Sequence, residues 1–155
     1  ELFKVLSGID MVGIVYKGGG PALIDVLGGQ IAAFFSGVAS GGAHIKAGKL
    51  RALAVTTLKR SRVAEDIPTM SQAGVPGYDA NAWFGVFAPT GTPDAVIARL
   101  QSEISRIVKV PEVRDRFLAL GAEPVGNTPE QFAAFYRNEV LKWAKVVKES
   151  GAQID

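Results

Sequence analysis

The feature that most constrains this chain is a glycine-rich segment that joins a short apolar run, residues 11–15, to a helix-like stretch, residues 23–27. The segment reads Tyr16-Lys17-Gly18-Gly19-Gly20-Pro21-Ala22. A strand that turns through glycines into a helix leaves backbone N–H groups unpaired at the helix start. Those donors and the helix dipole suit a carboxylate or a phosphate. Pro21 fits the first helical turn, where its missing N–H costs nothing. We interpret the segment as an anion-binding loop, with a plain tight turn as the alternative.

The loop does not match the common nucleotide-binding motifs. A P-loop has a lysine and a hydroxyl residue after its glycines, whereas Lys17 comes before them. A dinucleotide fingerprint has the spacing Gly-x-Gly-x-x-Gly, which is absent as well. The motif therefore favours an anion without specifying which anion.

Composition restricts the classes of function. A chain of 155 residues is long enough for one domain with a core. Its apolar fraction of 48% and charged fraction of 21% are typical of globular proteins. The net charge is only +2, and few aromatic residues accompany the loose basic cluster at residues 46–62. We therefore expect no nucleic-acid partner.

The reactive side chains are few. The chain has no cysteine, so disulfides and thiol chemistry are excluded, and its single histidine, His44, excludes multi-histidine metal sites. No paired acid and base is apparent, and we assign Asp25 to a solvated helix face. We expect no catalytic residue, no metal and no cofactor. No apolar stretch reaches transmembrane length. The first residues read as the end of a helix capped by Gly8, so we expect a piece whose start is missing.

Residues 1–80 alternate apolar runs with short helices. Strand-like runs are predicted at residues 12–16, 31–35 and 50–56. Helices are predicted at residues 21–27, 40–47 and 66–73. This βαβ rhythm predicts an α/β fold with a parallel sheet.

The pattern changes after another strand-like run at residues 80–88. Beyond the Pro-rich turn that ends at Pro93, apolar residues recur at helical spacing. Helices are predicted from Pro93, over residues 112–120, and from Thr128 to about Ser150. Thr128, followed by Pro129 and by Gln131, is typical of a capped helix start.

Five sequence segments, in the order in which they occur along the chain, resemble those of one family. They are residues 15–22 with Leu27-Gly28-Gly29-Gln30, residues 44–56, residues 67–78, residues 83–93, and Leu120-Gly121-Ala122-Glu123-Pro124 with the Trp143 helix. The chain resembles the Bug family, the periplasmic solute receptors of bacterial tripartite tricarboxylate transporters. The resemblance covers essentially all of the chain, and it is to the C-terminal half of family members.

The resemblance implies a type II periplasmic-binding-protein fold, in which two α/β lobes close on a ligand. Residues 1–80 would form lobe two without its first strand, residues 81–92 would cross between the lobes, and residues 93–155 would belong largely with a missing lobe one. Helices that lack the lobe they cover would expose apolar surface. We therefore predict self-association or domain swapping through the helical segment.

The resemblance also implies the ligand-binding residues. Gly18, Gly19, Gly20, Pro21 and Ala22 match the family loop that presents backbone amides to a ligand carboxylate. Tyr16 would line the pocket. Lys17 would attract anions at long range, or would be a plain surface lysine.

A second candidate pair, Ser36 and Gly37, follows a predicted strand at the end where open α/β sheets bind ligands. The alternative for Ser36 is an N-cap of the next helix.

The leading hypothesis is thus a non-enzymatic periplasmic receptor that captures a small organic carboxylate or an acidic amino acid. It would close by a hinge and present the ligand to a membrane permease. One alternative is an inactive fragment with half a cleft. The other is an enzyme that uses the glycine loop for a phosphate-bearing substrate.

Overall fold

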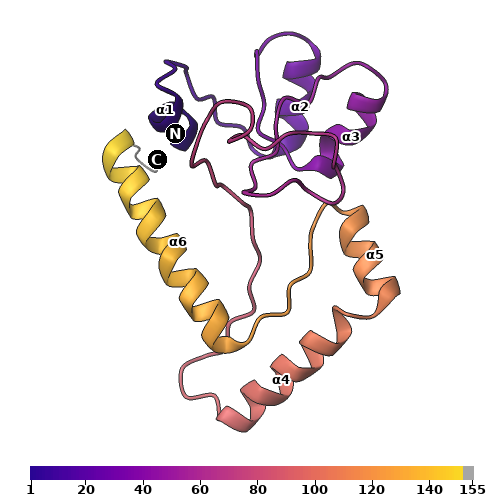
Figure 1. The fold of residues 1–155 in the computed structure, drawn as a ribbon, viewed down its shortest axis with the longest axis vertical. Coiled ribbons are helices and arrows are strands. Elements are labelled where there is room, and N and C mark those ends of the chain that lie inside the picture. The colour runs from indigo at the N-terminus through magenta and orange to yellow at the C-terminus, as the bar shows by residue number, and fades with distance from the viewer. Residues whose placement is uncertain (152–155) are drawn as a thin grey trace. The chain divides into compact units, whose positions relative to one another are not determined.

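The computed structural model of the chain describes residues 1–151. They divide into two compact units, residues 1–80 and the residues from Asn81 onward. Unit 1 contains the helices α1 (Leu2–Ser7), α2 (Gly19–Leu27) and α3 (Val38–Lys46). Unit 2 contains α4 (Asp94–Ile107), α5 (Pro111–Ala119) and α6 (Pro129–Ser150) (Figure 1). Whether these units correspond to the predicted lobes stays a prediction.

The helix boundaries in unit 1 follow the glycines. Helix α1 ends at Gly8, whose φ of 68° lets its N–H donate to the Lys4 carbonyl, as predicted. Helix α2 begins at Gly19, two residues earlier than predicted, and α3 begins at Val38 instead of Ser40. In both helices the residue before the start, Gly18 or Gly37, is the N-cap, a position at which glycine is accepted.

The predicted strands at residues 12–16, 31–35, 50–56 and 80–88 do not form a sheet among the described residues. The pairing found there is one parallel bridge between Val55 and Thr69. The Val55 N–H donates to the Pro68 carbonyl at 2.8 Å, and the Met70 N–H donates to the Val55 carbonyl at 2.9 Å. A parallel strand needs a neighbour along its whole length to form a ladder, and the other runs have none in the described part.

The predicted helix at residues 66–73 is wrong, because this segment is a turn. Thr69 and Gln72 exchange two side-chain-to-backbone hydrogen bonds, each of 3.1 Å, and the Ala73 N–H donates to the Thr69 carbonyl. The chain then reverses at Gly74, with a φ of 106°. This positive φ, which glycine adopts without strain, ends the segment after a single turn.

The core of unit 1 is small. Its buried side chains are those of Ala22, Val55, Thr69, Val75 and Tyr78. The Phe3 ring packs edge-on against Phe35 and Tyr78, with centroids 5.9 and 6.3 Å apart. These contacts connect α1 to the run before α3 through Phe35 and to the segment after the parallel bridge through Tyr78.

In unit 2, α6 starts as predicted. The Thr128 hydroxyl accepts from the Gln131 N–H, and the Gln131 side chain accepts from the Thr128 N–H, so the capping box is complete. Next to this start lies a group of five aromatic side chains in mutual ring contact, which we call the α6 aromatic cluster. It consists of Trp83, Phe87, Phe132, Phe135 and Tyr136.

Unit 2 also buries a charged group. Glu139 on α6 is only 7% exposed; its carboxylate accepts from the Trp143 indole at 3.1 Å and pairs with Lys142. Burial by itself raises the pKa of Glu139. The hydrogen bonds from Lys142 and Trp143, the charge of Lys142 and a contact with Trp83 outweigh it and hold the pKa below its usual value.

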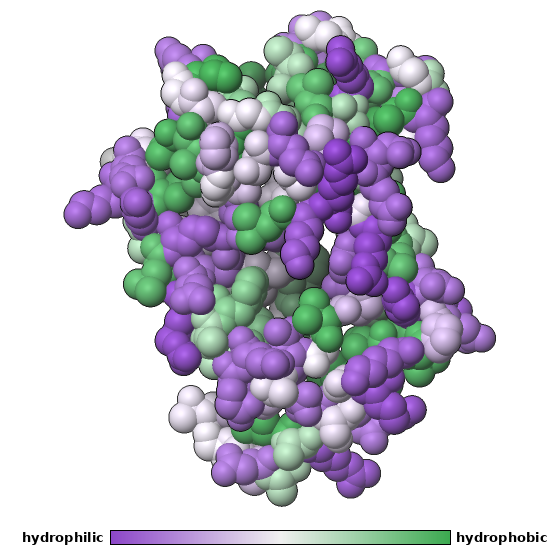
Figure 2. Space-filling view, viewed as in Figure 1, coloured by the Kyte–Doolittle hydropathy of each residue, from purple (hydrophilic) through white to green (hydrophobic). Residues whose placement is uncertain are grey.

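Apolar side chains are exposed along much of the described chain. Val12, Val15 and Phe84 are 87%, 96% and 95% exposed, and within residues 1–151 no large side chain is fully buried. Figure 2 shows hydrophobic residues scattered between polar ones on the visible face. No helix within residues 1–151 has both the length and the apolar character needed to cross a membrane.

Candidate functional site: the glycine loop of unit 1

The glycine loop turns directly into α2. Gly18 is the N-cap residue, with φ of 110° and ψ of 172°, a conformation open essentially to glycine alone. Neither a side-chain cap nor an acidic residue occupies the first turn of α2. The amides of this turn are therefore available to a ligand, and the helix dipole favours a negative one.

A tyrosine and an aspartate span the loop. The Tyr16 hydroxyl donates a hydrogen bond to Asp25 Oδ2 at 2.7 Å, between side chains that are both partly buried. This bond, followed by burial and then by the charge of Asp25, raises the pKa of Tyr16. The assignment of Asp25 to a solvated helix face was therefore wrong. The sequence signal for this hydrogen bond was the presence of Tyr16 and Asp25 on either side of the glycines, nine positions apart.

The loop packs on the run that precedes α3. A Cβ at Gly19 would lie 3.7 Å from the Phe34 ring, an ordinary van der Waals contact, and Ala22 in the first turn of α2 is buried. Gly18 and Gly20 face open space on the Cβ side, and Pro21 is exposed. The loop is thus anchored on one side and accessible on the other.

The second candidate pair does not cap a helix with a side chain. Gly37, not Ser36, is the N-cap of α3, and the Ser36 hydroxyl donates to the Gly37 carbonyl at 3.2 Å. That helix start also lacks a side-chain cap, and Ser36 is exposed beside it. The N-cap interpretation of Ser36 is wrong.

Lys17 is exposed, and within the described residues it forms no ion pair with an acidic side chain. An exposed lysine in such a position can attract an anionic ligand at long range. In residues 1–151 no group of three histidine, aspartate or glutamate side chains has an arrangement that would hold a metal ion.

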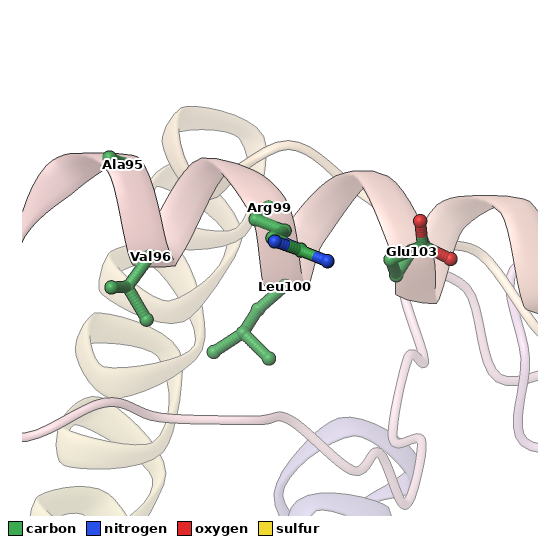
Figure 3. A pocket seen from close by; sticks show the side chains of 5 residues that line it. All are labelled: Ala95, Val96, Arg99, Leu100 and Glu103. Atoms are coloured by element: carbon green, nitrogen blue, oxygen red, sulfur yellow. The ribbon is translucent and has the colours of Figure 1, made fainter.

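A separate hollow lies along α4 in unit 2. Figure 3 shows that its lining residues all come from this one helix; they are Ala95, Val96, Arg99, Leu100 and Glu103. A ligand site usually gathers polar groups from several elements around an enclosed space. A hollow lined by one helix does not do so, and the glycine loop is the stronger candidate.

Comparison with solved structures defines the class of protein. The chain matches a Rhodopseudomonas palustris protein, Rpa4515 with adipate, with a TM-score of 0.82 and 33% identity over 97% of this chain. It matches the periplasmic binding protein BugD with a TM-score of 0.73 and 32% identity over 98% of this chain. The fold is therefore that of periplasmic binding proteins, an α/β class, as predicted.

Sequence comparison then gives the family. Residues 1–152 match the family described as the tripartite tricarboxylate transporter family receptor. The Bug protein BugT of Bordetella pertussis is 40% identical over 99% of this chain. The chain belongs to this receptor family, and the predicted resemblance is confirmed.

The same comparisons limit what is established. The chain spans about half the length of these proteins: 47% of BugT, 50% of Rpa4515 and 52% of BugD. The family consists of solute-binding receptors and not of enzymes, which removes the phosphate-binding enzyme as an alternative. Its members are periplasmic binding proteins.

Proposed function

We propose that this chain captures a small organic carboxylate for a periplasmic transport receptor, through the backbone amides of the glycine loop. The observation that supports this most directly is the uncapped start of α2 behind Gly18. Amides without an internal partner, aligned with the positive end of a helix, form a favourable site for one carboxylate group. The adipate of the similar Rpa4515 structure is a ligand of the same chemical class.

Each residue of the loop has a proposed part. Gly18, Gly19 and Gly20 present the amides, while Pro21 and Ala22 fix the first turn of α2. Tyr16 lines the loop, and Lys17 adds attraction for anions. Ser36 and Gly37 supply polar groups from the neighbouring helix start. Mono- and dicarboxylates and acidic amino acids all carry the group that this arrangement recognises.

The proposal extends to the transport partners of the complete receptor. The complete receptor closes two lobes over its ligand by a hinge and presents it to a membrane permease in the periplasm. This chain, with its exposed apolar residues, associates with itself through unit 2.

The test is a thermal-shift titration of this chain with adipate, malate, aspartate and glutamate. Adipamide, which has the length of adipate without its charge, is the matched control ligand. A carboxylate at about one hundred times its dissociation constant adds about 2.7 kcal/mol of stability. A shift with a carboxylate and none with adipamide supports the proposal. No shift in a folded sample contradicts it and favours the inactive half-cleft.

A further inference from the structure

The positive charge of this chain is concentrated in one stretch of unit 1, residues 44–62, which we call the basic stretch. It contains six lysine and arginine side chains and no acidic one; they are Lys46, Lys49, Arg51, Lys59, Arg60 and Arg62. The basic stretch therefore carries a charge of +6, whereas the rest of the chain holds 11 basic and 15 acidic residues and carries −4. All six side chains are exposed. The small net charge of +2 thus hides a one-sided distribution.

The backbone places part of this charge on one side of unit 1. The Lys49 N–H donates to the His44 carbonyl at 2.9 Å, which closes a turn directly after α3. From residue 49 to residue 54, exposed and half-buried residues alternate, and the exposed ones are Lys49, Arg51 and Leu53. In an extended run, alternate side chains point to the same side. These three side chains therefore face solvent together.

The charges of the basic stretch are not compensated by acidic neighbours. Arg62 aside, none of its members forms an ion pair with an acidic side chain in residues 1–151. Arg60 donates to the side-chain oxygen of Gln72 at 3.0 Å and to the backbone carbonyl of Glu65 at 2.9 Å, and both acceptors are uncharged. Because covering such cations with apolar protein surface would cost their hydration, they are suited to water or to an anionic partner.

Two leucines are exposed among these charges. Leu53 and Leu58 are 66% and 65% exposed. Basic side chains together with exposed leucines are typical of surfaces that bind anionic bilayers, where the cations meet the headgroups and the leucines enter the acyl boundary.

Other anionic partners fit the basic stretch less well. It contains no phenylalanine, tyrosine or tryptophan. Such aromatic residues stack on the bases of single-stranded nucleic acids and are enriched in protein interfaces, from which lysine is depleted. A fluid lipid surface needs no fixed arrangement of charges, which suits lysines on flexible side chains.

We propose that the basic stretch binds reversibly to a bilayer surface that carries anionic phospholipid headgroups. The lysines and arginines are attracted by the headgroup phosphates, and Leu53 and Leu58 lie at the boundary with the acyl chains. This contact goes beyond the capture of a carboxylate, because it assigns a second binding surface to unit 1. A receptor held at a membrane in this way reaches a permease by moving along the surface.

The first test is co-sedimentation of the chain with vesicles of phosphatidylglycerol and phosphatidylcholine in equal amounts. Vesicles of phosphatidylcholine alone are the reference. We expect binding to the mixed vesicles only. It should weaken between about 0.01 M and about 0.15 M salt, since the Debye length falls from about 30 Å to about 8 Å. Equal binding to both kinds of vesicle, or no binding to the mixed vesicles at low salt, overturns the proposal.

A matched pair of double variants separates the basic stretch from net charge. Lys49→Gln with Arg51→Gln removes two charges from the stretch, and Lys109→Gln with Arg114→Gln removes two from equally exposed residues of unit 2. Each basic residue near an anionic surface contributes about fivefold to binding, so the first double variant should lower the partition coefficient about 25-fold. The second should leave it nearly unchanged. Equal losses in both would mean that only net charge matters, which overturns the proposal.

A third double variant tests for a lipid partner. Leu53→Ser with Leu58→Ser keeps every charge, and it should weaken binding to the mixed vesicles because the leucines no longer enter the bilayer. Far-UV circular dichroism should be unchanged, since both side chains are exposed. A chain that binds polyglutamate or a single-stranded oligonucleotide, but not the mixed vesicles, overturns the proposal and assigns the basic stretch to an acidic protein or to a nucleic acid.

None of these assays includes a carboxylate ligand. A chain that binds the mixed vesicles but gives no thermal shift contradicts the proposed ligand and leaves the bilayer contact standing. A chain that gives the shift with adipate but binds no vesicles does the reverse.

Discussion

The Tyr16 hydroxyl and Asp25 Oδ2 are joined by a 2.7 Å hydrogen bond whose two residues lie on either side of the glycine loop. The bond ties the residue that enters the loop to the second turn of α2. Because the loop has no side-chain cap of its own, this tether is the polar side-chain contact that restricts how the glycines approach a ligand.

Removing the tether should loosen the loop and weaken binding. We expect Tyr16→Phe to raise the dissociation constant for a bound carboxylate several-fold, measured by isothermal titration calorimetry. Tyr136→Phe, in the aromatic cluster of unit 2, is the control and should leave the constant unchanged. Equal affinities of Tyr16→Phe and the unchanged chain would show that the tether does not position the loop.

The unusual backbone of Gly18 gives a second prediction. A Cβ at φ of 110° and ψ of 172° is strained by about 1–3 kcal/mol, so Gly18→Ala should lower stability and abolish the carboxylate-dependent thermal shift. Gly29→Ala strains the other end of α2, where φ is 71°. That control should lower stability and retain the shift. Loss of the shift in both variants would assign the effect to helix stability in general.

A third prediction compares two ion pairs with the same spacing on a helix. In the pair of Glu139 with Lys142 the glutamate is buried and the lysine side chain is 26% exposed, whereas Glu103 and Arg106 have side chains 52% and 68% exposed. Glu139→Ala removes the buried carboxylate that accepts from the Trp143 indole and pairs with Lys142, and should cost about 1–3 kcal/mol in urea unfolding. Glu103→Ala should cost less than about 1 kcal/mol. A similar cost for both would mean that burial of Glu139 contributes nothing.

The buried phenol of Tyr78 predicts a dependence on alkaline pH. Burial raises its pKa above the ordinary value of 10.0, because the folded state favours the neutral phenol. The resulting stability is fully present below about pH 10 and is lost as the pH rises through the folded pKa. Tyr16 shifts in the same direction.

The measurement is the melting temperature by far-UV circular dichroism from pH 8 to pH 11. We expect it to fall less steeply above pH 10 in Tyr78→Phe than in the unchanged chain. Parallel curves for the two proteins would contradict the role given to Tyr78.

Local signals in the sequence were sufficient to predict several helix boundaries. Thr128, Pro129 and Gln131 together determine a helix start from neighbouring residues alone, and Gly8 ends α1 for an equally local reason. The family phrases identified the fold class correctly. The strand-like runs were not sufficient, because a strand depends on a distant partner, and only Val55 and Thr69 meet as a bridge in the described residues.

The candidate site was predicted only in part. Glycine spacing located the loop, since backbone conformation is a property of the segment itself. The contact from Tyr16 to Asp25 was missed because it depends on how two side chains turn toward each other. Glu139 was missed for a related reason: a single glutamate in a helix resembles a surface residue until the packing of Trp143 and Lys142 around it is known.

Both tryptophans of the chain, Trp83 and Trp143, lie in unit 2, whereas the glycine loop lies in unit 1. Tryptophan emission, excited where tyrosine does not absorb, therefore reports on unit 2 and not on unit 1. In a denaturant titration, emission would follow the loss of the aromatic environment of Trp83 and the carboxylate contact of Trp143, while far-UV circular dichroism would follow the helices of both units. A difference between the denaturation midpoints of the two curves would show that unit 1 and unit 2 unfold independently, and the experiment needs no added label.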